Sequence, residues 1–329
     1  MWDFDIGRTL GIMARTWPFI LLRMVVYFSI TLAYVLATGA GAGVGFGVGY
    51  AFEEQGGPGA FAFWGGLVGF GLVSAFVYWV REYILYIVKA GHIAVMVRLI
   101  DGQDIPGGQM QITYARDIVT DRFAEANVLF VLDQLIKGVV RVITGLLGGI
   151  AAFLPIPGLQ GLVRFANTVI RLSLTYVDEI ILGYNIRMES TEPFESGRRG
   201  IVLYAQNGTT MLKNAVWLAI FLWVLSFAVF LVMIAPAAAL LYVLPGDWSS
   251  FGFVLALVFA WSLKQAILEP FAITCLMQVY FKAIEGQQPD PVWDERLSAA
   301  SGRFREMKER AIDWARGRSS AYSLSRNNS

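Results

Sequence analysis

Long apolar stretches are the feature that most constrains how this chain can fold. A helix that crosses the hydrocarbon core of a bilayer needs about 20 apolar residues, and six stretches of the chain are long enough. They cover about 18–51, 60–100, 128–154, 158–188, 215–244 and 251–284. Because an unpaired strand cannot satisfy its backbone groups in lipid, the sequence predicts an all-α, polytopic membrane protein with about six transmembrane helices.

Three turns rich in proline and glycine join these stretches in pairs. The turns, at 53–58, 155–158 and 245–247, contain no lysine or arginine, whereas the other connections and the C-terminal segment contain many. Lysine and arginine concentrate in the cytoplasmic loops of membrane proteins. We therefore expect three helical hairpins in a bacterial inner membrane, with both termini in the cytoplasm.

Amphipathic segments flank the predicted six-span domain, which covers 17–285. Residues 1–16 mix apolar and charged side chains, as a helix in the membrane interface does. Residues 286–316 predict one cytoplasmic helix with a narrow apolar stripe, which consists of Leu297, Ala300, Phe304, Met307, Ala311 and Trp314. The stripe can lie on the membrane, on the protein's own cytoplasmic face or against a partner helix. Residues 317–329 are rich in serine, arginine and asparagine, and we expect them to be disordered.

Three similar segments end the second, fourth and sixth apolar stretches. They lie at 98–104, 187–191 and 282–288, and a proline and an amphipathic stretch follow each of them. The pattern indicates a unit of interfacial helix plus hairpin that is used three times. The alternative is a chance match between membrane sequences of low complexity.

Six glycines alternate with other residues in the first apolar stretch: Gly39, Gly41, Gly43, Gly45, Gly47 and Gly49. On a helix they form two G-x-x-x-G series that lie on opposite faces, and each series allows a neighbouring helix to approach closely. The series indicate helix packing within one subunit, an oligomer interface or a flexible pore-lining element.

Ionisable residues inside the apolar stretches are the strongest indication of a functional site. Placing one charge at the centre of a bilayer costs about 2.5–3.5 kcal/mol on insertion scales. The candidate substrate-binding residues are Arg81, Glu82, Arg171, Asp178, Glu179, Trp261, Lys264 and Glu269. The three cations of this set recur at similar positions before the acidic ends of the even stretches, which predicts a common polar interior. The alternative is that each cation forms a local, structural ion pair.

Composition narrows the function further. The chain has a single cysteine, Cys275, and a single histidine, His92, which excludes an internal disulfide and metal sites built from several of these residues. The net charge of +1 is unlike that of a nucleic-acid-binding polycation. We expect no enzymatic activity, cofactor or metal. The expected partners are membrane lipids and either a second copy of the chain or another membrane protein.

Segments within 65–310 resemble the membrane core of the choline-transporter-like family. The resemblance rests on 88–98 with Asp101, Pro106 and 114–118, on Tyr184-Asn185 with 194–196 and 213–215, and on 279–285. It implies a transporter or permease for a small polar or charged solute. An organic cation is one candidate, because Asp178, Glu179 and Glu269 can supply negative charge and Trp261 an aromatic face. The alternative is a non-transporting scaffold or a lipid-interacting assembly protein.

Overall fold

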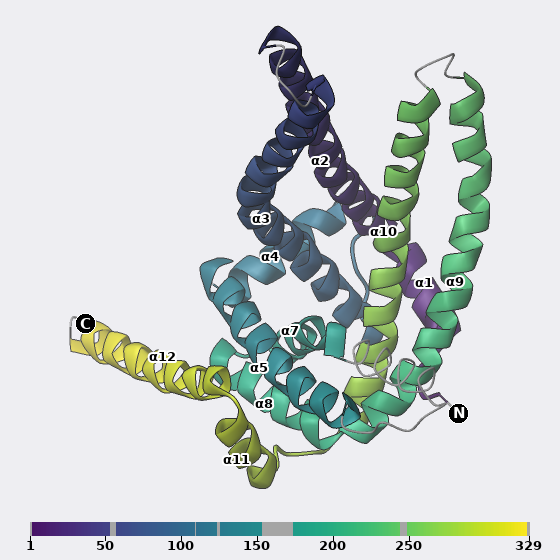
Figure 1. Ribbon diagram of the computed structural model, residues 1–329. Coiled ribbons are helices and arrows are strands. Elements are labelled where there is room, and N and C mark those ends of the chain that lie inside the picture. The colour runs from purple at the N-terminus through teal and green to yellow at the C-terminus, as the bar shows by residue number, and fades with distance from the viewer. Residues whose placement is uncertain are drawn as a thin grey trace. The chain divides into compact units, whose positions relative to one another are not determined.

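The computed structural model describes residues 2–52, 57–108, 110–123, 126–152, 174–243 and 249–327, and every regular element in these ranges is a helix (Figure 1). The prediction of an all-α protein is confirmed for them. Three of the described helical segments are long and apolar enough to cross a membrane: Trp17–Ala51, Gly208–Met233 and Leu257–Ala283. These segments are compatible with the predicted membrane protein.

The helices follow the predicted stretches closely. Those that coincide with the stretches are α2 (Trp17–Phe52), α3 (Gly57–Ile100), α5 (Ala126–Ala152), α7 (Val177–Arg187), α9 (Gly208–Val243) and α10 (Ser249–Ala283). Of the fourth stretch, only the part from 174 onward lies within the described residues. The amphipathic helices are α1 (Ile6–Arg15), α4 (Met110–Phe123), α8 (Pro193–Gln206), α11 (Pro291–Ala300) and α12 (Gly302–Asn327).

The same local backbone geometry recurs at three places in the chain. After α3, α7 and α10 the chain turns through a residue in the left-handed region: Gly102 at φ 75°, Glu189 at φ 51° and Gly286 at φ 72°. An amphipathic helix follows each of these turns: α4, α8 and α11. Thr16 and Asn207, which join an amphipathic helix to the next long helix, also have nearly equal backbone angles (φ −100°, ψ 22° and φ −98°, ψ 14°).

The chain divides into two compact units, and the single six-span domain over 17–285 stays a prediction. The first, which we call the polar unit, comprises 1–18, 89–223 and 270–329 and contains the amphipathic helices. The second, which we call the apolar unit, comprises 19–88 and 224–269. Large apolar side chains such as Val44, Tyr50, Phe63 and Leu72 are exposed on the apolar unit, as on a lipid-facing surface.

In the apolar unit, α2 packs on α3 through one of the two predicted glycine series. A Cβ atom added at Gly41 or Gly45 would collide with the backbone carbonyls of Gly65 and Phe61, and Gly49 is also buried. The other series, Gly39, Gly43 and Gly47, is exposed and has no atom within 4 Å of an added Cβ. We predicted that neighbouring helices can approach α2 closely at both glycine series. Within the described part of the chain, only the series of Gly41, Gly45 and Gly49 is approached by another helix.

The predicted single helix over 286–316 is two helices, α11 and α12. Ser301 has extended backbone angles (φ −131°, ψ 116°), and its hydroxyl oxygen accepts a hydrogen bond from the Phe304 N–H at 3.3 Å, as an N-cap does. The sequence offered a signal for this break, because serine and glycine stand together at 301–302. The helix continues to Asn327, where we expected disorder from 317.

The apolar stripe of α12 lies on the protein itself, which was one of the three predicted alternatives. Phe304 and Met307 are completely buried where α12 packs on α5 and α8. Trp314 donates a hydrogen bond from its indole nitrogen to the Thr191 carbonyl at 3.1 Å, and its ring lies 5.9 Å from that of Phe194. The stripe therefore holds α12 on the polar unit.

Candidate functional site

A cluster of buried charges joins α3, α5 and α7 in the polar unit. The Lys89 ammonium on α3 lies 3.1 Å from the Glu179 carboxylate on α7. The Lys137 ammonium on α5 lies 2.7 Å from Asp133, one turn before it, and 3.8 Å from Asp178 on α7. The three carboxylate side chains are only 8%, 11% and 8% exposed for Asp133, Asp178 and Glu179. We call these five residues the carboxylate–lysine cluster.

The local fold brings both α7 carboxylates to the start of a helix. The predicted fourth stretch is not one continuous helix within the described residues, because Tyr176 leaves the helical region (φ −112°, ψ 14°) and α7 begins at Val177. Asp178 and Glu179 occupy the first turn of α7. The partial positive charge of a helix N-terminus favours carboxylates at these positions.

The charges of the cluster do not balance. Among the residues that the structure describes here, three carboxylates face two ammonium groups, which leaves one surplus negative charge when all five groups are ionised. Glu179 Oε2 is buried and has no hydrogen-bond partner among the residues that the structure describes. A buried charge without full compensation is costly. The cluster is therefore suited to hold one additional positive charge.

A second buried ion pair connects α2 and α10 in the apolar unit. Arg23 is completely buried, and its Nη1 lies 3.3 Å from Glu269 Oε2. The hydroxyl of Tyr27 donates a hydrogen bond to the same carboxylate oxygen, and the Tyr27 ring meets Trp261 edge-on at 5.9 Å. Lys264, another of the candidate substrate-binding residues, is exposed. Arg23 was absent from the predicted site, although it is the only residue of the first apolar stretch that is charged at neutral pH.

The structure thus separates the predicted site residues. Asp178 and Glu179 belong to the carboxylate–lysine cluster, whereas Trp261, Lys264 and Glu269 belong to the apolar unit. The side chains of Arg81 and Glu82, and all of Arg171, lie outside the described residues. The predicted common interior for the three cations therefore stays a prediction.

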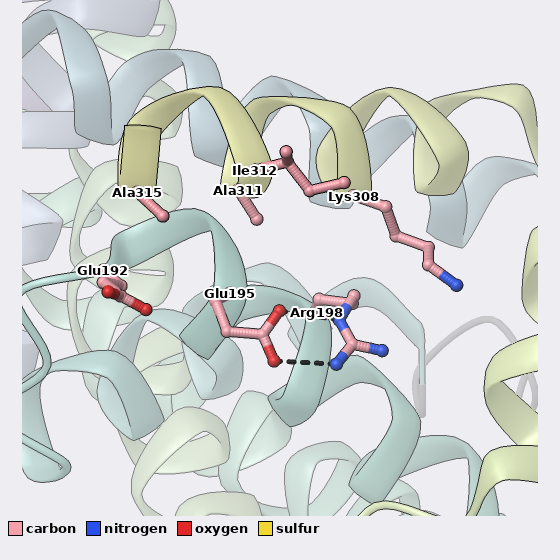
Figure 2. Close-up of a pocket in the computed structure, with 7 residues that line it drawn as sticks. All are labelled: Glu192, Glu195, Arg198, Lys308, Ala311, Ile312 and Ala315. Carbon is pink, nitrogen blue, oxygen red and sulfur yellow. Dashed lines mark hydrogen bonds and ion pairs between the residues drawn. The ribbon is translucent and has the colours of Figure 1, made fainter. Parts of the chain in front are cut away.

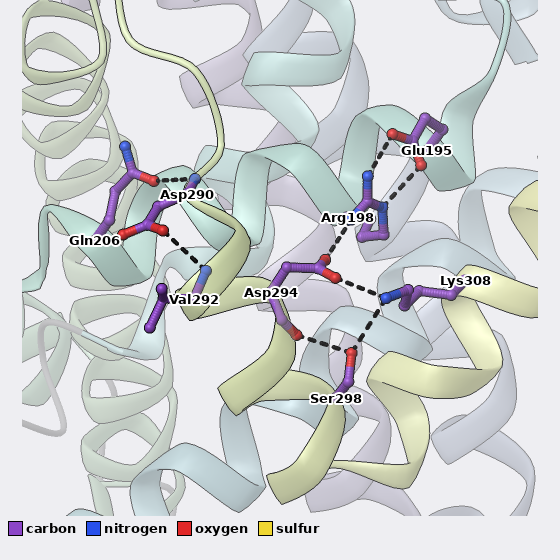
Figure 3. Close-up of polar contacts among 8 residues, drawn as sticks. All are labelled: Glu195, Arg198, Gln206, Asp290, Val292, Asp294, Ser298 and Lys308. Atoms are coloured by element: carbon purple, nitrogen blue, oxygen red, sulfur yellow. Dashed lines mark hydrogen bonds and ion pairs between the residues drawn. The ribbon is translucent and has the colours of Figure 1, made fainter.

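A surface cavity of about 460 Å³ lies between α8 and α12 in the polar unit. Its walls are formed by Glu192, Glu195, Arg198, Lys308, Ala311, Ile312 and Ala315 (Figure 2). Beside it, Asp294 of α11 forms ion pairs with Arg198 and with Lys308, whose ammonium is 2.6 Å away (Figure 3). Burial of Asp294 opposes its ionisation, but the hydrogen bond from Lys308 and the charge of Arg198 outweigh this effect and lower its pKa.

No protein-family model, curated protein or solved structure matches this chain. The resemblance to the choline-transporter-like family therefore stays a prediction, and function has to be inferred from the sites themselves.

Proposed function

We propose that this protein is an integral membrane transporter for a small cation and that the carboxylate–lysine cluster is its polar site. The observation that carries the proposal is that, among the described residues of the cluster, three buried carboxylates on α5 and α7 face only two ammonium groups, those of Lys89 and Lys137. A transported monocation or a proton would neutralise the surplus. A cluster that only stabilises the fold would be more stable with equal numbers of carboxylates and ammonium groups, because no buried charge would then be uncompensated.

The break before α7 supports the same proposal. Transporters commonly place their binding sites where a membrane helix is interrupted, because the freed backbone groups and the half-helix end face the ligand. Non-helical backbone at membrane depth is tolerated only where protein or a water-filled cavity surrounds it. Asp178 and Glu179 follow directly after such an interruption at Tyr176.

The proposed arrangement in the membrane is six spans in three hairpins, with both termini in the cytoplasm of a bacterial cell. The absence of lysine and arginine from the turns at 53–58, 155–158 and 245–247 supports this orientation. The family resemblance and the carboxylate surplus both favour an organic cation as substrate.

Flux into liposomes tests the proposal. We expect purified protein to admit radiolabelled tetramethylammonium, or protons reported by an internal pH dye, faster than empty liposomes do. Glu179→Gln should lower this flux at least tenfold and leave the melting temperature close to that of the wild type. Glu309→Gln, which changes an exposed carboxylate on α12, is the matched control and should have no effect. Flux equal to that of empty liposomes for both probes would overturn the proposal.

A double variant separates a functional site from a structural ion pair. Lys89→Met leaves Glu179 uncompensated and should cost about 3–5 kcal/mol of stability. Adding Glu179→Leu should restore stability, because both charges are then gone. If the restored protein also regains wild-type flux, the pair is structural and the cluster is not the transport site.

The second candidate function is a non-transporting scaffold or lipid-interacting assembly protein. The exposed glycine series Gly39, Gly43 and Gly47 favours it, because a helix of a second copy or of another membrane protein could approach there. Co-purification of a stoichiometric membrane partner, without flux of any probe, would support this function instead.

A further inference from the structure

The cavity between α8 and α12 has walls of two different kinds. Figure 2 shows Ala311 and Ala315 pointing from α12 towards Glu192 and Glu195, with Lys308 and Arg198 gathered at one end. The wall that α12 contributes is therefore apolar where it faces Glu192, and the wall on the other side carries the carboxylates of Glu192 and Glu195. Its volume of about 460 Å³ lies in the range of about 300–1,000 Å³ that small-molecule sites occupy.

Four charged groups beside the cavity neutralise one another. Arg198 donates two hydrogen bonds to Glu195, at 2.7 and 2.8 Å, and also forms an ion pair with Asp294. Lys308 forms an ion pair with Asp294 at 2.6 Å (Figure 3). Two cations thus face two carboxylates, and all three guanidinium nitrogens of Arg198 contact a carboxylate of this network.

The carboxylate of Glu192 lines the cavity but is not part of this network of ion pairs. Its backbone takes part in a turn with Ser190, but its carboxylate makes no hydrogen bond or ion pair with any residue that the structure describes. The cavity therefore carries one surplus negative charge next to an apolar wall of two alanines and Ile312.

We propose that this cavity binds a small organic monocation of the alkylammonium class. The ammonium group would pair with Glu192, and the alkyl part would lie on Ala311 and Ala315. A hard metal ion is a poor fit, because Mg²⁺ and Ca²⁺ require several oxygen ligands and the described residues that line the cavity offer only one unpaired carboxylate, that of Glu192. Because the walls come from α8 and α12, the bound cation stabilises the docked position of α12.

Equilibrium binding to the full-length protein in detergent tests this proposal without any measurement of transport. Titration calorimetry with butylammonium chloride should give saturable binding, whereas sodium butyrate and potassium chloride should give none. Glu192→Gln should weaken binding at least tenfold, and the matched control Glu309→Gln should not change it. Butylammonium should also slow the cleavage of α12 by trypsin in the wild type but not in Glu192→Gln.

Glu179→Gln distinguishes this cavity from the carboxylate–lysine cluster. Binding that survives Glu179→Gln and is lost in Glu192→Gln belongs to the cavity, even if the protein transports nothing. Binding that is lost only in Glu179→Gln overturns the proposal, as does the absence of saturable binding up to about 10 mM, beyond which affinity is too weak for a specific site. Equal competition by potassium ions overturns it too.

Discussion

Two helix contacts in this protein are built on opposite principles. In the apolar unit, α2 meets α3 through glycines whose missing side chains let the two backbones touch. In the polar unit, α12 is held on α5 and α8 by the large buried side chains Phe304 and Met307 and by ion pairs at Asp294. One contact depends on the absence of side chains and the other on their presence.

In the proposed membrane arrangement, the surroundings of each contact explain the difference. Between helices in lipid there is no hydrophobic driving force, because the lipid tails are as apolar as the side chains, so close backbone approach supplies the attraction. A charged helix in water gains most by removing its few apolar side chains from solvent. The two contacts should therefore fail through different substitutions, and each failure tests one side of the comparison.

The largest effect is expected at α12. Phe304→Asp together with Met307→Asp places two carboxylates at positions with 0% exposure, which costs several kcal/mol per ion, or about 5 kcal/mol or more for the pair. We expect α12 to leave α5 and α8 while the long helices stay folded. The rate of trypsin cleavage within α12 measures this release.

Glu309→Asp is the control for the α12 variant, because Glu309 is exposed on the same helix and does not line the cavity between α8 and α12. It should leave the cleavage rate near that of the wild type. Equal cleavage of the double variant and the wild type would mean that the apolar stripe does not hold α12.

A smaller effect is expected from one methyl group in the α2–α3 contact. Gly45→Ala places its Cβ on the Phe61 carbonyl, so the helices must move apart, at a cost of about 2 kcal/mol. Gly43→Ala adds the same atom two residues away, where nothing lies within 4 Å. Thermal unfolding in detergent should therefore separate the two variants. Equal melting temperatures would show that the glycine contact does not stabilise the protein.

The glycine contact shows where sequence reasoning reached its limit. The spacing in 39–49 identified two helix faces correctly, but α2 is apolar on every side, so no polar face reveals which series meets α3. The stripe was easier to read, because charged residues outline it. Three of its members, Leu297, Phe304 and Met307, are buried, and Trp314 donates a hydrogen bond to the Thr191 carbonyl, whereas the sequence left open what the stripe would contact.

The sequence identified residues of the candidate sites, but it did not show which residues would pair with one another. Asp178 and Glu179 were identified because charges in apolar stretches are costly. Their lysine partners lie about 90 and 41 residues away along the chain, at Lys89 and Lys137, and no spacing rule connects positions on different helices. Arg23 was missed because it stands near the start of a stretch, where a charge normally reaches the membrane surface.

The smallest effect concerns the ion pairs that join α11 to α8 and α12. Asp294→Asn removes the carboxylate that faces both Arg198 and Lys308, and partly exposed ion pairs contribute about 1 kcal/mol or less. We expect α12 to stay docked at neutral pH in this variant but to be released at a lower urea concentration. A fluorescent probe on a cysteine at Ala315, in a Cys275→Ala background, reports the release.

The pH dependence of that release identifies Asp294 as its source. The pKa of Asp294 is lowered below its ordinary value of 3.8, so its contribution is fully present above that value and is lost as the pH falls through the lowered pKa. The urea midpoint of the wild type should therefore fall as the pH is lowered from 3.8 through the lowered pKa of Asp294, and that of Asp294→Asn should fall less. Glu306→Gln is the control: the pKa of Glu306 is also lowered, by a hydrogen bond from Arg303, but its ion-pair partners Arg303 and Arg310 lie on α12 itself. Glu306→Gln could instead reduce the pH dependence of the urea midpoint as much as Asp294→Asn does. The pH dependence would then come from the stability of α12 itself rather than from its docking, and the ion pairs of Asp294 would not hold the helix in place.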